Sequence, residues 1–270
     1  MKDRIQGPLK FGPALFFGMI LVAIGGYAAS GYTWAGWQVP DCYPACFCEA
    51  FQPGPIVQPQ SSYSNLVIVM VGLMIMGAAN ASWKLDGEHN LFLRGKAYSL
   101  GYGAAVVVVG LTSLFYHISL TFAGQMLDYI GMYLFASFVA LYELARLRWL
   151  RGKAFWGAWL ALNAGLVISL LARPELRRYL FVGLVASLLV LEGLVFYARR
   201  PVHIRFEFLA TAIAIFGVAL ATNLSDESGA LCVRESWWQW HAFWHILVAA
   251  AMGLLYLYFR SEKVAQGELA

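Results

Sequence analysis

Long apolar runs separated by short polar connections dominate the sequence. Each run approaches the roughly 20 apolar residues that an α-helix needs to cross a hydrocarbon core about 30 Å thick. The runs are continuously apolar and do not alternate with polar residues, which favours transmembrane helices over the strands of a membrane barrel. We expect eight spans, at residues 12–30, 63–83, 97–120, 124–145, 154–172, 177–198, 206–224 and 240–259.

The composition agrees with this pattern and limits the classes of function. Hydrophobic residues make up 60% of the 270 residues and charged residues only 13%, whereas a soluble domain has about 25% charged residues. In such a chain the net charge of +4 does not indicate nucleic-acid binding. Connections are short except at 31–62 and 225–239, and the chain shows no internal repeat, so we expect a single all-α, polytopic membrane helix bundle.

Lysine and arginine residues lie mostly in alternate connections, which predicts an orientation. With the N-terminus in the cytoplasm, only four of the 19 basic residues fall on the outer side, and the other 15 fall on the cytoplasmic side. Basic connections of membrane proteins face the cytoplasm. We therefore expect an integral membrane protein with both termini in the cytoplasm; the four outer basic residues are Arg173, Arg177, Arg178 and Arg234.

The first apolar run also resembles a secretory signal peptide, because a basic stretch precedes it and YAAS closes it at 27–30. Cleavage there would leave seven spans with an N-terminus outside the cytoplasm, so the orientation of the remaining chain would be the same. We expect the helix at 12–30 to be retained as an additional span.

Three of the five histidines are expected at one depth, on the extracytoplasmic side. His117 closes the third span in the stretch SLFYH, and His241 with His245 opens the last span in HAFWH. Residues four apart share a helix face, so His241 and His245 can bind the same ion, and Ser113 lies one turn from His117. Three imidazoles bind zinc at about 2.0–2.1 Å and leave a fourth position for water, which is typical of catalytic zinc.

Asp128 begins the fourth span shortly after His117 and is expected at the same depth. An ionisable group inside a span is functional by default, although Asp128 could instead cap its helix. Taken singly, His117 could be an interfacial hydrogen-bonding residue, and Ser113 could bond to a carbonyl of its own helix. Their coincidence at one depth favours a metal site.

Other polar residues inside the spans have structural explanations. Buried or interfacial acids near a basic residue form ion pairs or extend toward the membrane surface. We expect Asn163 and Asn223 to form hydrogen bonds between helices. The acid and base pairs expected from proximity in sequence are Glu143 with Arg146, Glu192 with Arg199, and Glu207 with Arg205.

All four cysteines fall in the two long outer connections, where the environment is oxidising, so they are read as disulfides. Four cysteines allow three pairings. One of these joins Cys48 to Cys232, which would tie together the two long connections, and leaves Cys42 with Cys46. Alternatively, Cys42, Cys46 and Cys48 could form a second metal site.

The long connection that contains Cys48 ends in a Pro-rich stretch followed by SSYSNL at 61–66. Ser61 or Ser62 is expected to cap the helix that follows. Asn65, one turn further, is expected at the depth of the histidines. It either packs helices through hydrogen bonds or orients a metal ligand or the substrate.

These motifs resemble the alkaline ceramidase family, within the CREST superfamily of seven-helix metal-dependent hydrolases, which also includes adiponectin-receptor-like proteins and GPI-remodelling lipid hydrolases. The resemblance is carried by SLFYH with Asp128 eleven residues after His117, by HAFWH, and by CE at 48–49 followed by YSNL at 63–66. It implies a seven-transmembrane hydrolase domain at 46–260, preceded by the N-terminal helix and the start of the outer loop at 1–45 and followed by a cytoplasmic tail at 261–270.

The resemblance also implies roles for single residues. His117, His241 and His245 correspond to the zinc ligands, and Ser113 and Asp128 to the two other catalytic positions. Animal ceramidases of this type carry calcium in their N-terminal segment. Here Glu49 matches one acidic position of that site, but Cys46 stands where an Asp is expected. The resemblance therefore supports only one of these two acidic calcium ligands.

The resulting hypothesis is a zinc-dependent intramembrane hydrolase that cleaves an N-acyl sphingolipid to a fatty acid and a sphingoid base with zinc-activated water. Asp128 would transfer the protons, and Ser113 would stabilise the oxyanion. The alternatives are a lipid esterase of the same superfamily, a receptor-like protein or channel with structural zinc, and a protein that binds haem through two histidines. Histidine-box desaturases and a Ser113 nucleophile fit less well, because the first need more histidines and the second lacks a Gly-rich turn.

Overall fold

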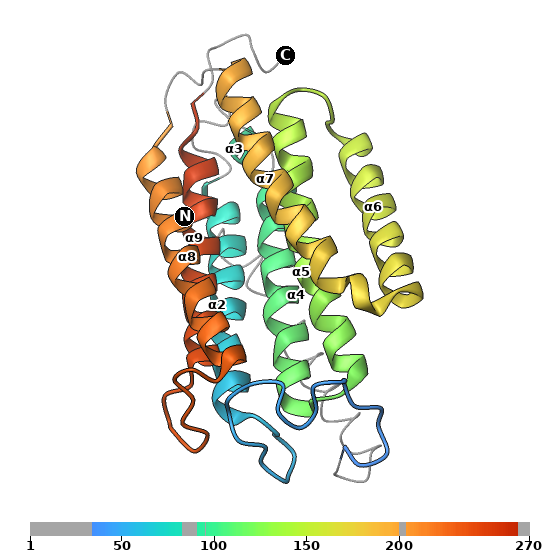
Figure 1. Ribbon diagram of the computed structural model, residues 1–270. Coiled ribbons are helices and arrows are strands. Elements are labelled where there is room, and N and C mark those ends of the chain that lie inside the picture. The colour runs from blue at the N-terminus through green and yellow to red at the C-terminus, as the bar shows by residue number, and fades with distance from the viewer. Residues whose placement is uncertain (1–33, 83–90, 95, 200–203, 264–270) are drawn as a thin grey trace, which may run out of the picture.

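The computed structural model describes residues 34–82, 91–94, 96–199 and 204–263, and these residues form helices and no β-strand. The long helices lie side by side in one bundle (Figure 1). Their bounds are α2 (Pro59–Ser82), α3 (Leu91–Arg94), α4 (Lys96–Ser119), α5 (Phe122–Arg146), α6 (Lys153–Ala172), the 3-10 helix η1 (Pro174–Leu176), α7 (Arg177–Arg199), α8 (Phe206–Ser228) and α9 (Trp240–Ser261).

Seven of the described helices, all except α3 and η1, are long and apolar enough to cross a membrane. This confirms seven of the predicted spans and the class of an all-α membrane helix bundle. The span expected at 12–30 lies outside the described residues, so the additional N-terminal helix stays a prediction.

The helices pack in a defined order. Among the described elements, α2 packs against α4 and α9, α8 packs against α9, and α5 packs against α4, α6 and α7. In Figure 1, α2, α8 and α9 lie on one side of the bundle and α6 lies at the opposite side. We call the end where α4 and α8 stop and α2, α5 and α9 begin the histidine end, because His117, His241 and His245 lie there.

Glycines allow α2 and α4 to approach closely. A Cβ atom on Gly110 of α4 would lie 2.9 Å from the backbone nitrogen of Val69 and 3.0 Å from the carbonyl oxygen of Asn65, both on α2. Real Cβ atoms are essentially never found so close to backbone atoms, so the contact requires glycine. Small residues at such crossings are how membrane helices gain packing energy. The close approach brings the start of α2 beside the end of α4.

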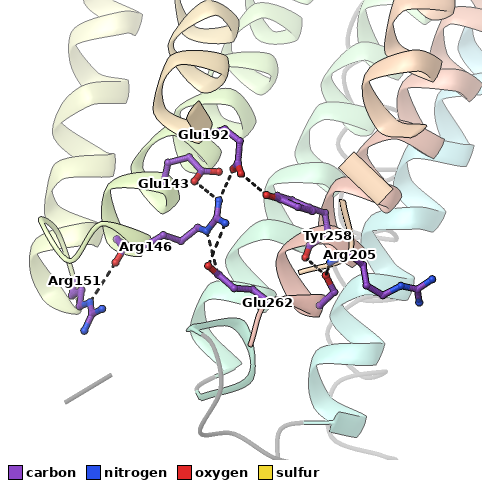
Figure 2. A network of polar contacts seen from close by, with 9 residues as sticks. Glu143, Arg146, Arg151, Glu192, Arg205, Tyr258 and Glu262 are labelled. Atoms are coloured by element: carbon purple, nitrogen blue, oxygen red, sulfur yellow. Dashed lines mark hydrogen bonds and ion pairs between the residues drawn. The ribbon is translucent and has the colours of Figure 1, made fainter. Parts of the chain in front are cut away.

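A buried ion network lies at the end of the bundle opposite the histidine end (Figure 2). The guanidinium of Arg146, whose side chain is 2% exposed, contacts Glu143 of α5 at 2.6 Å, Glu192 of α7 at 2.5 Å and Glu262 at the end of α9 at 3.2 Å. The hydroxyl of Tyr258 donates to Glu192. The sequence predicted a pair of Glu192 with Arg199, which lies nearby in the chain. It did not predict the contact of Glu192 with Arg146 of another helix.

One other expected ion pair and one of the two expected asparagine hydrogen bonds between helices are present. Glu207 pairs with Arg205 at 2.5 Å. Asn163 forms the expected bond between helices, since its amide donates to the Ser137 hydroxyl of α5 at 2.8 Å. The amide of Asn223 instead donates to Glu227 of its own helix at 3.1 Å, because its side chain lies on an exposed part of α8.

Candidate metal centre

Three buried histidines meet at the histidine end. One ring nitrogen from each of His117, His241 and His245 lies within 4.8 Å of the others. The Nε2 atoms of His117 and His241 are 3.2 Å apart. His117 is 1% exposed, His245 2% and His241 5%. The helical spacing of HAFWH and the depth of SLFYH thus bring these side chains together as the sequence predicts.

The donor set fits a metal ion. Two nitrogens bound at about 2.0–2.1 Å in a tetrahedral arrangement are about 3.3 Å apart, close to the 3.2 Å between the Nε2 atoms of His117 and His241. One ring nitrogen from each of the three buried imidazoles lies close enough to the others to bind the same ion. The three imidazoles can therefore hold a divalent cation between them.

A segment of the long connection before α2 covers the three histidines at the histidine end of the bundle. We call residues 34–58 the strap; it crosses the ends of the helices in blue in Figure 1. Its backbone caps the end of α4, since the N–H groups of Val57 and Gln58 donate to the carbonyl oxygens of Ile118 and His117 at 3.0 and 3.1 Å. The ring of Phe47 packs 4.0 Å from that of His241 and 4.8 Å from that of His117. The strap thus shields the imidazoles from water.

Each of two histidines bonds to a neutral side chain through its Nδ1 atom. Gln58, which is 0% exposed, places Oε1 2.8 Å from Nδ1 of His117. Ser64 on the first turns of α2 places Oγ 2.8 Å from Nδ1 of His245. Sequence reasoning did not identify Gln58 or Ser64, because their partners lie 59 and 181 residues away along the chain. Gln58 lies between CE and YSNL, and Ser64 lies within YSNL, so these motifs are the signal that pointed to this region.

Asp226 at the end of α8 joins the strap to the start of α9. Its carboxylate accepts hydrogen bonds from the backbone nitrogens of Cys48 at 3.0 Å and His241 at 3.3 Å. Negative charge is favourable at a helix N-terminus, where N–H groups lack partners within the helix. This contact fixes where His241 enters α9, and sequence analysis did not predict it.

The cysteines form two disulfides, Cys48 with Cys232 and Cys42 with Cys46. All four cysteines are therefore bonded to one another. This pairing excludes the alternative in which Cys42, Cys46 and Cys48 hold a second metal. The bond between Cys48 and Cys232 links the strap to the connection that leads into α9.

Glu49 caps α2, which corrects the expectation that Ser61 or Ser62 does so. Its carboxylate accepts from the backbone nitrogens of Gln60 at 2.8 Å and Ser61 at 2.9 Å, and Pro59 occupies the first helical position, as is common. The helix consequently starts four residues before the predicted residue 63. Burial raises the pKa of Glu49, and the hydrogen bonds from Ser61 and Gln60 offset this only in part.

Asn65 is fully buried near the start of α2, but its amide donates to the carbonyl oxygen of Ser61 in its own helix at 2.8 Å. Its Oδ1 atom has no hydrogen-bond partner among the described residues. The nearby residue that bonds to a histidine is Ser64. Orientation of a ligand by Asn65 therefore stays a prediction.

Ser113 and Asp128 are neighbours across the contact between α4 and α5. The buried Ser113 hydroxyl lies next to the half-buried carboxyl group of Asp128. Thr121, and not Asp128, caps α5, since its hydroxyl accepts from the backbone nitrogen of Gly124 at 3.0 Å. The capping explanation of Asp128 is therefore wrong. Ser113 lies one helical turn before His117 on α4, so this contact between α4 and α5 lies toward the histidine end.

The chain is similar in sequence to a known lipid hydrolase. Alkaline ceramidase 1 of Mus musculus is 26% identical to this chain over 162 residues, which cover 55% of the chain and 57% of the relative. The chain thus spans a little over half the length of the curated relative that it matches. No family model matches the chain. The match and the seven apolar helices support similarity to ceramidases.

Proposed function

We propose that the protein is a zinc-dependent hydrolase that cleaves the amide bond of an N-acyl sphingolipid inside the membrane, as a ceramidase does. The observation that carries the proposal is the convergence of His117, His241 and His245, buried and with no carboxylate among the three ligands. The match to alkaline ceramidase 1 supports the same class of reaction. Imidazole ligands suit zinc, whereas calcium prefers oxygen ligands.

Calcium near Glu49 is not part of the proposal. Both carboxylate oxygens of Glu49 accept hydrogen bonds from the backbone of α2. The position equivalent to an expected acid is Cys46, which is bonded to Cys42. The side chain at Glu49 thus has a structural role in starting the helix that carries Ser64.

The proposed reaction assigns separate tasks to the residues around the histidines. A bound zinc ion would lower the pKa of a coordinated water toward about 7 and polarise the substrate carbonyl. The carboxylate of Asp128 accepts a proton from the attacking water and returns it to the nitrogen of the leaving amine. The hydroxyl of Ser113 donates a hydrogen bond to the oxygen on which negative charge develops.

The lipid would enter sideways from the leaflet nearest the histidine end. The distribution of lysine and arginine along the sequence predicts that this end faces the extracytoplasmic side. An acyl chain and a sphingoid chain would then remain in hydrocarbon while the amide group reaches the histidines, which lie on the first turns of α9 and the last turn of α4.

Replacing a proposed ligand tests the function directly. We expect His117→Ala and His241→Ala to lose stoichiometric zinc and to release fatty acid from ceramide only at background rate. His203→Ala, a histidine outside the group of three, is the matched control and should keep both properties. Zinc is measured by elemental analysis of purified protein and product by mass spectrometry.

Three outcomes contradict the proposal. Full zinc content or full activity in either ligand variant would remove that histidine from the site. Turnover of a phospholipid or GPI-like ester in place of ceramide would assign an esterase. Zinc binding without turnover of either lipid class would leave a receptor-like protein.

A further inference from the structure

The hydroxyl of Ser64 has one hydrogen, and the neighbouring carbonyl oxygen determines where it points, because a carbonyl oxygen can only accept. The hydroxyl donates to the carbonyl oxygen of Ser61 at 2.9 Å. It must therefore accept in its second contact, the 2.8 Å approach to Nδ1 of His245. Neutral imidazole has one N–H and one lone pair, so the proton of His245 is on Nδ1. The lone pair of Nε2 is then available to a metal ion.

The amide of Gln58 leads to the same result for His117. Its NH₂ group faces the carbonyl oxygen of Glu49 at 3.4 Å, where the opposite orientation would place two oxygens together. The remaining amide atom, Oε1, can only accept, and it lies 2.8 Å from Nδ1 of His117. The proton of His117 is therefore also on Nδ1, with the lone pair on Nε2.

His241 lacks such a partner. Its Nδ1 atom is buried without a hydrogen bond among the described residues, and its Nε2 atom lies 3.2 Å from Nε2 of His117. In the metal-free protein, Nε2–H of His241 can donate to the lone pair of His117. Metal binding needs the Nδ1–H form of His241. In that form the Nε2 lone pairs of His117 and His241 can both point at the ion.

We propose that Gln58 and Ser64 are positioning residues that fix the neutral imidazoles of His117 and His245 in the Nδ1–H form, so that two of the three ligands are prepared for the metal before it binds. This proposal rests on the metal site of the proposed function. Partners of this kind orient ligand rings, and their loss typically lowers metal affinity about 10- to 100-fold. His241 is the ligand that adjusts when the ion arrives.

Zinc affinity, measured by competition with a chromophoric chelator, tests the two residues. We expect Gln58→Met and Ser64→Ala to bind zinc about 10- to 100-fold more weakly than the unchanged protein. Ser64→Thr keeps the hydroxyl and Gln58→Glu keeps an acceptor, so both should retain most of the affinity.

Matched controls separate positioning from general loss of structure. Ser62→Ala removes a fully buried hydroxyl two residues away that has no partner among the described residues. Gln52→Met changes an exposed glutamine of the strap. Both controls should bind zinc as tightly as the unchanged protein. Affinities of Gln58→Met and Ser64→Ala equal to those of the controls would overturn the proposal.

A spectroscopic measurement on the unchanged, metal-free protein does not depend on how the Gln58 and Ser64 variants fold. Nitrogen NMR of ¹⁵N-histidine should show His117 and His245 in the Nδ1–H form, assigned by loss of each signal in its own histidine variant. Dominance of the Nε2–H form at either residue would refute the proposal. Because this signal needs neither zinc nor lipid, its result is distinct from failure of ceramide hydrolysis.

Discussion

Asp128 and Ser113 differ from the three histidines in what they are expected to contribute. Their side chains adjoin each other on α5 and α4, and neither belongs to the group of side chains that could hold a metal. Proton transfer by a positioned carboxylate contributes about 10²- to 10⁴-fold to rate. Loss of either group should therefore affect turnover and leave metal binding intact.

We predict that Asp128→Asn lowers kcat for ceramide by about 10²- to 10⁴-fold with one zinc ion per protein retained. The amide occupies the same volume but cannot accept the proton. Asp41→Asn, an exposed change in the strap, is the control and should leave kcat unchanged. Steady-state kinetics and elemental analysis on the same preparations give both quantities, and loss of zinc in Asp128→Asn would contradict the separation of roles.

The residues that sequence reasoning missed share one property. Gln58 and Phe47 lie in a segment without helical or strand periodicity, and Ser64 is one of several serines in SSYSNL. Nothing in the local pattern distinguishes them, because their importance comes from contacts with distant residues. The histidines and Asp128 could be found because lipid penalises polar groups inside a span, which makes each such group conspicuous.

At the scale of elements, hydropathy predicted the helices well and their ends less well. Helix α8 continues to Ser228, beyond the predicted end at 224, and stops where Gly229 adopts a left-handed conformation with φ of 68°. The last turn of the helix consists of polar residues, which hydropathy does not include in a transmembrane span. The apolar run therefore ends before the helix does. Backbone hydrogen bonding, which sequence pattern does not reveal, sets the true boundary.

Interhelical charge pairing was harder to predict than the helices. Sequence proximity identifies Glu143 as a partner of Arg146, one helical turn away. It cannot identify Glu192 and Glu262, which approach Arg146 from α7 and from the end of α9. Three acidic side chains converge on one guanidinium only after the helices pack (Figure 2).

We predict that Arg146→Met destabilises the protein strongly. Removing one partner of a buried ion pair costs about 3–5 kcal/mol, since the remaining charges stay buried. Arg178→Met removes an exposed arginine, 65% exposed, that pairs with Glu227, and exposed pairs contribute only about 0–1 kcal/mol. The free energies of unfolding of the two variants are compared in a denaturing detergent. Equal values would show that the Arg146 network contributes little to holding α5, α7 and α9 together.

At the scale of the whole molecule, distant parts of the chain meet at the histidine end. A disulfide across 184 residues and the carboxylate of Asp226 join the strap to the connection before α9 and to the start of α9. Hydrogen bonds join the strap to the start of α2 and to the end of α4. The positions of Gln58 and Ser64 relative to the histidines depend on these ties. The helices of the bundle carry the three histidines, and the strap packs against them.

We predict that Cys48→Ser lowers both thermal stability and zinc affinity. A disulfide that closes a long loop contributes about 2–4 kcal/mol, and this one also restrains the strap beside His241. Cys42→Ser breaks the bond across four residues and should have a small effect on zinc affinity. Thermal unfolding and chelator competition without reductant distinguish the variants, and unchanged zinc affinity in Cys48→Ser would contradict a restraining role for the bond.

X-ray absorption at the zinc edge of the purified, unchanged protein tests the metal centre most directly. The account predicts one zinc ion per chain, with three imidazole nitrogens at about 2.0–2.1 Å and one further oxygen, and no sulfur ligand. A protein that retains no zinc after purification in metal-replete buffer, or one whose spectrum requires sulfur or fewer than three imidazoles, would contradict the proposed centre.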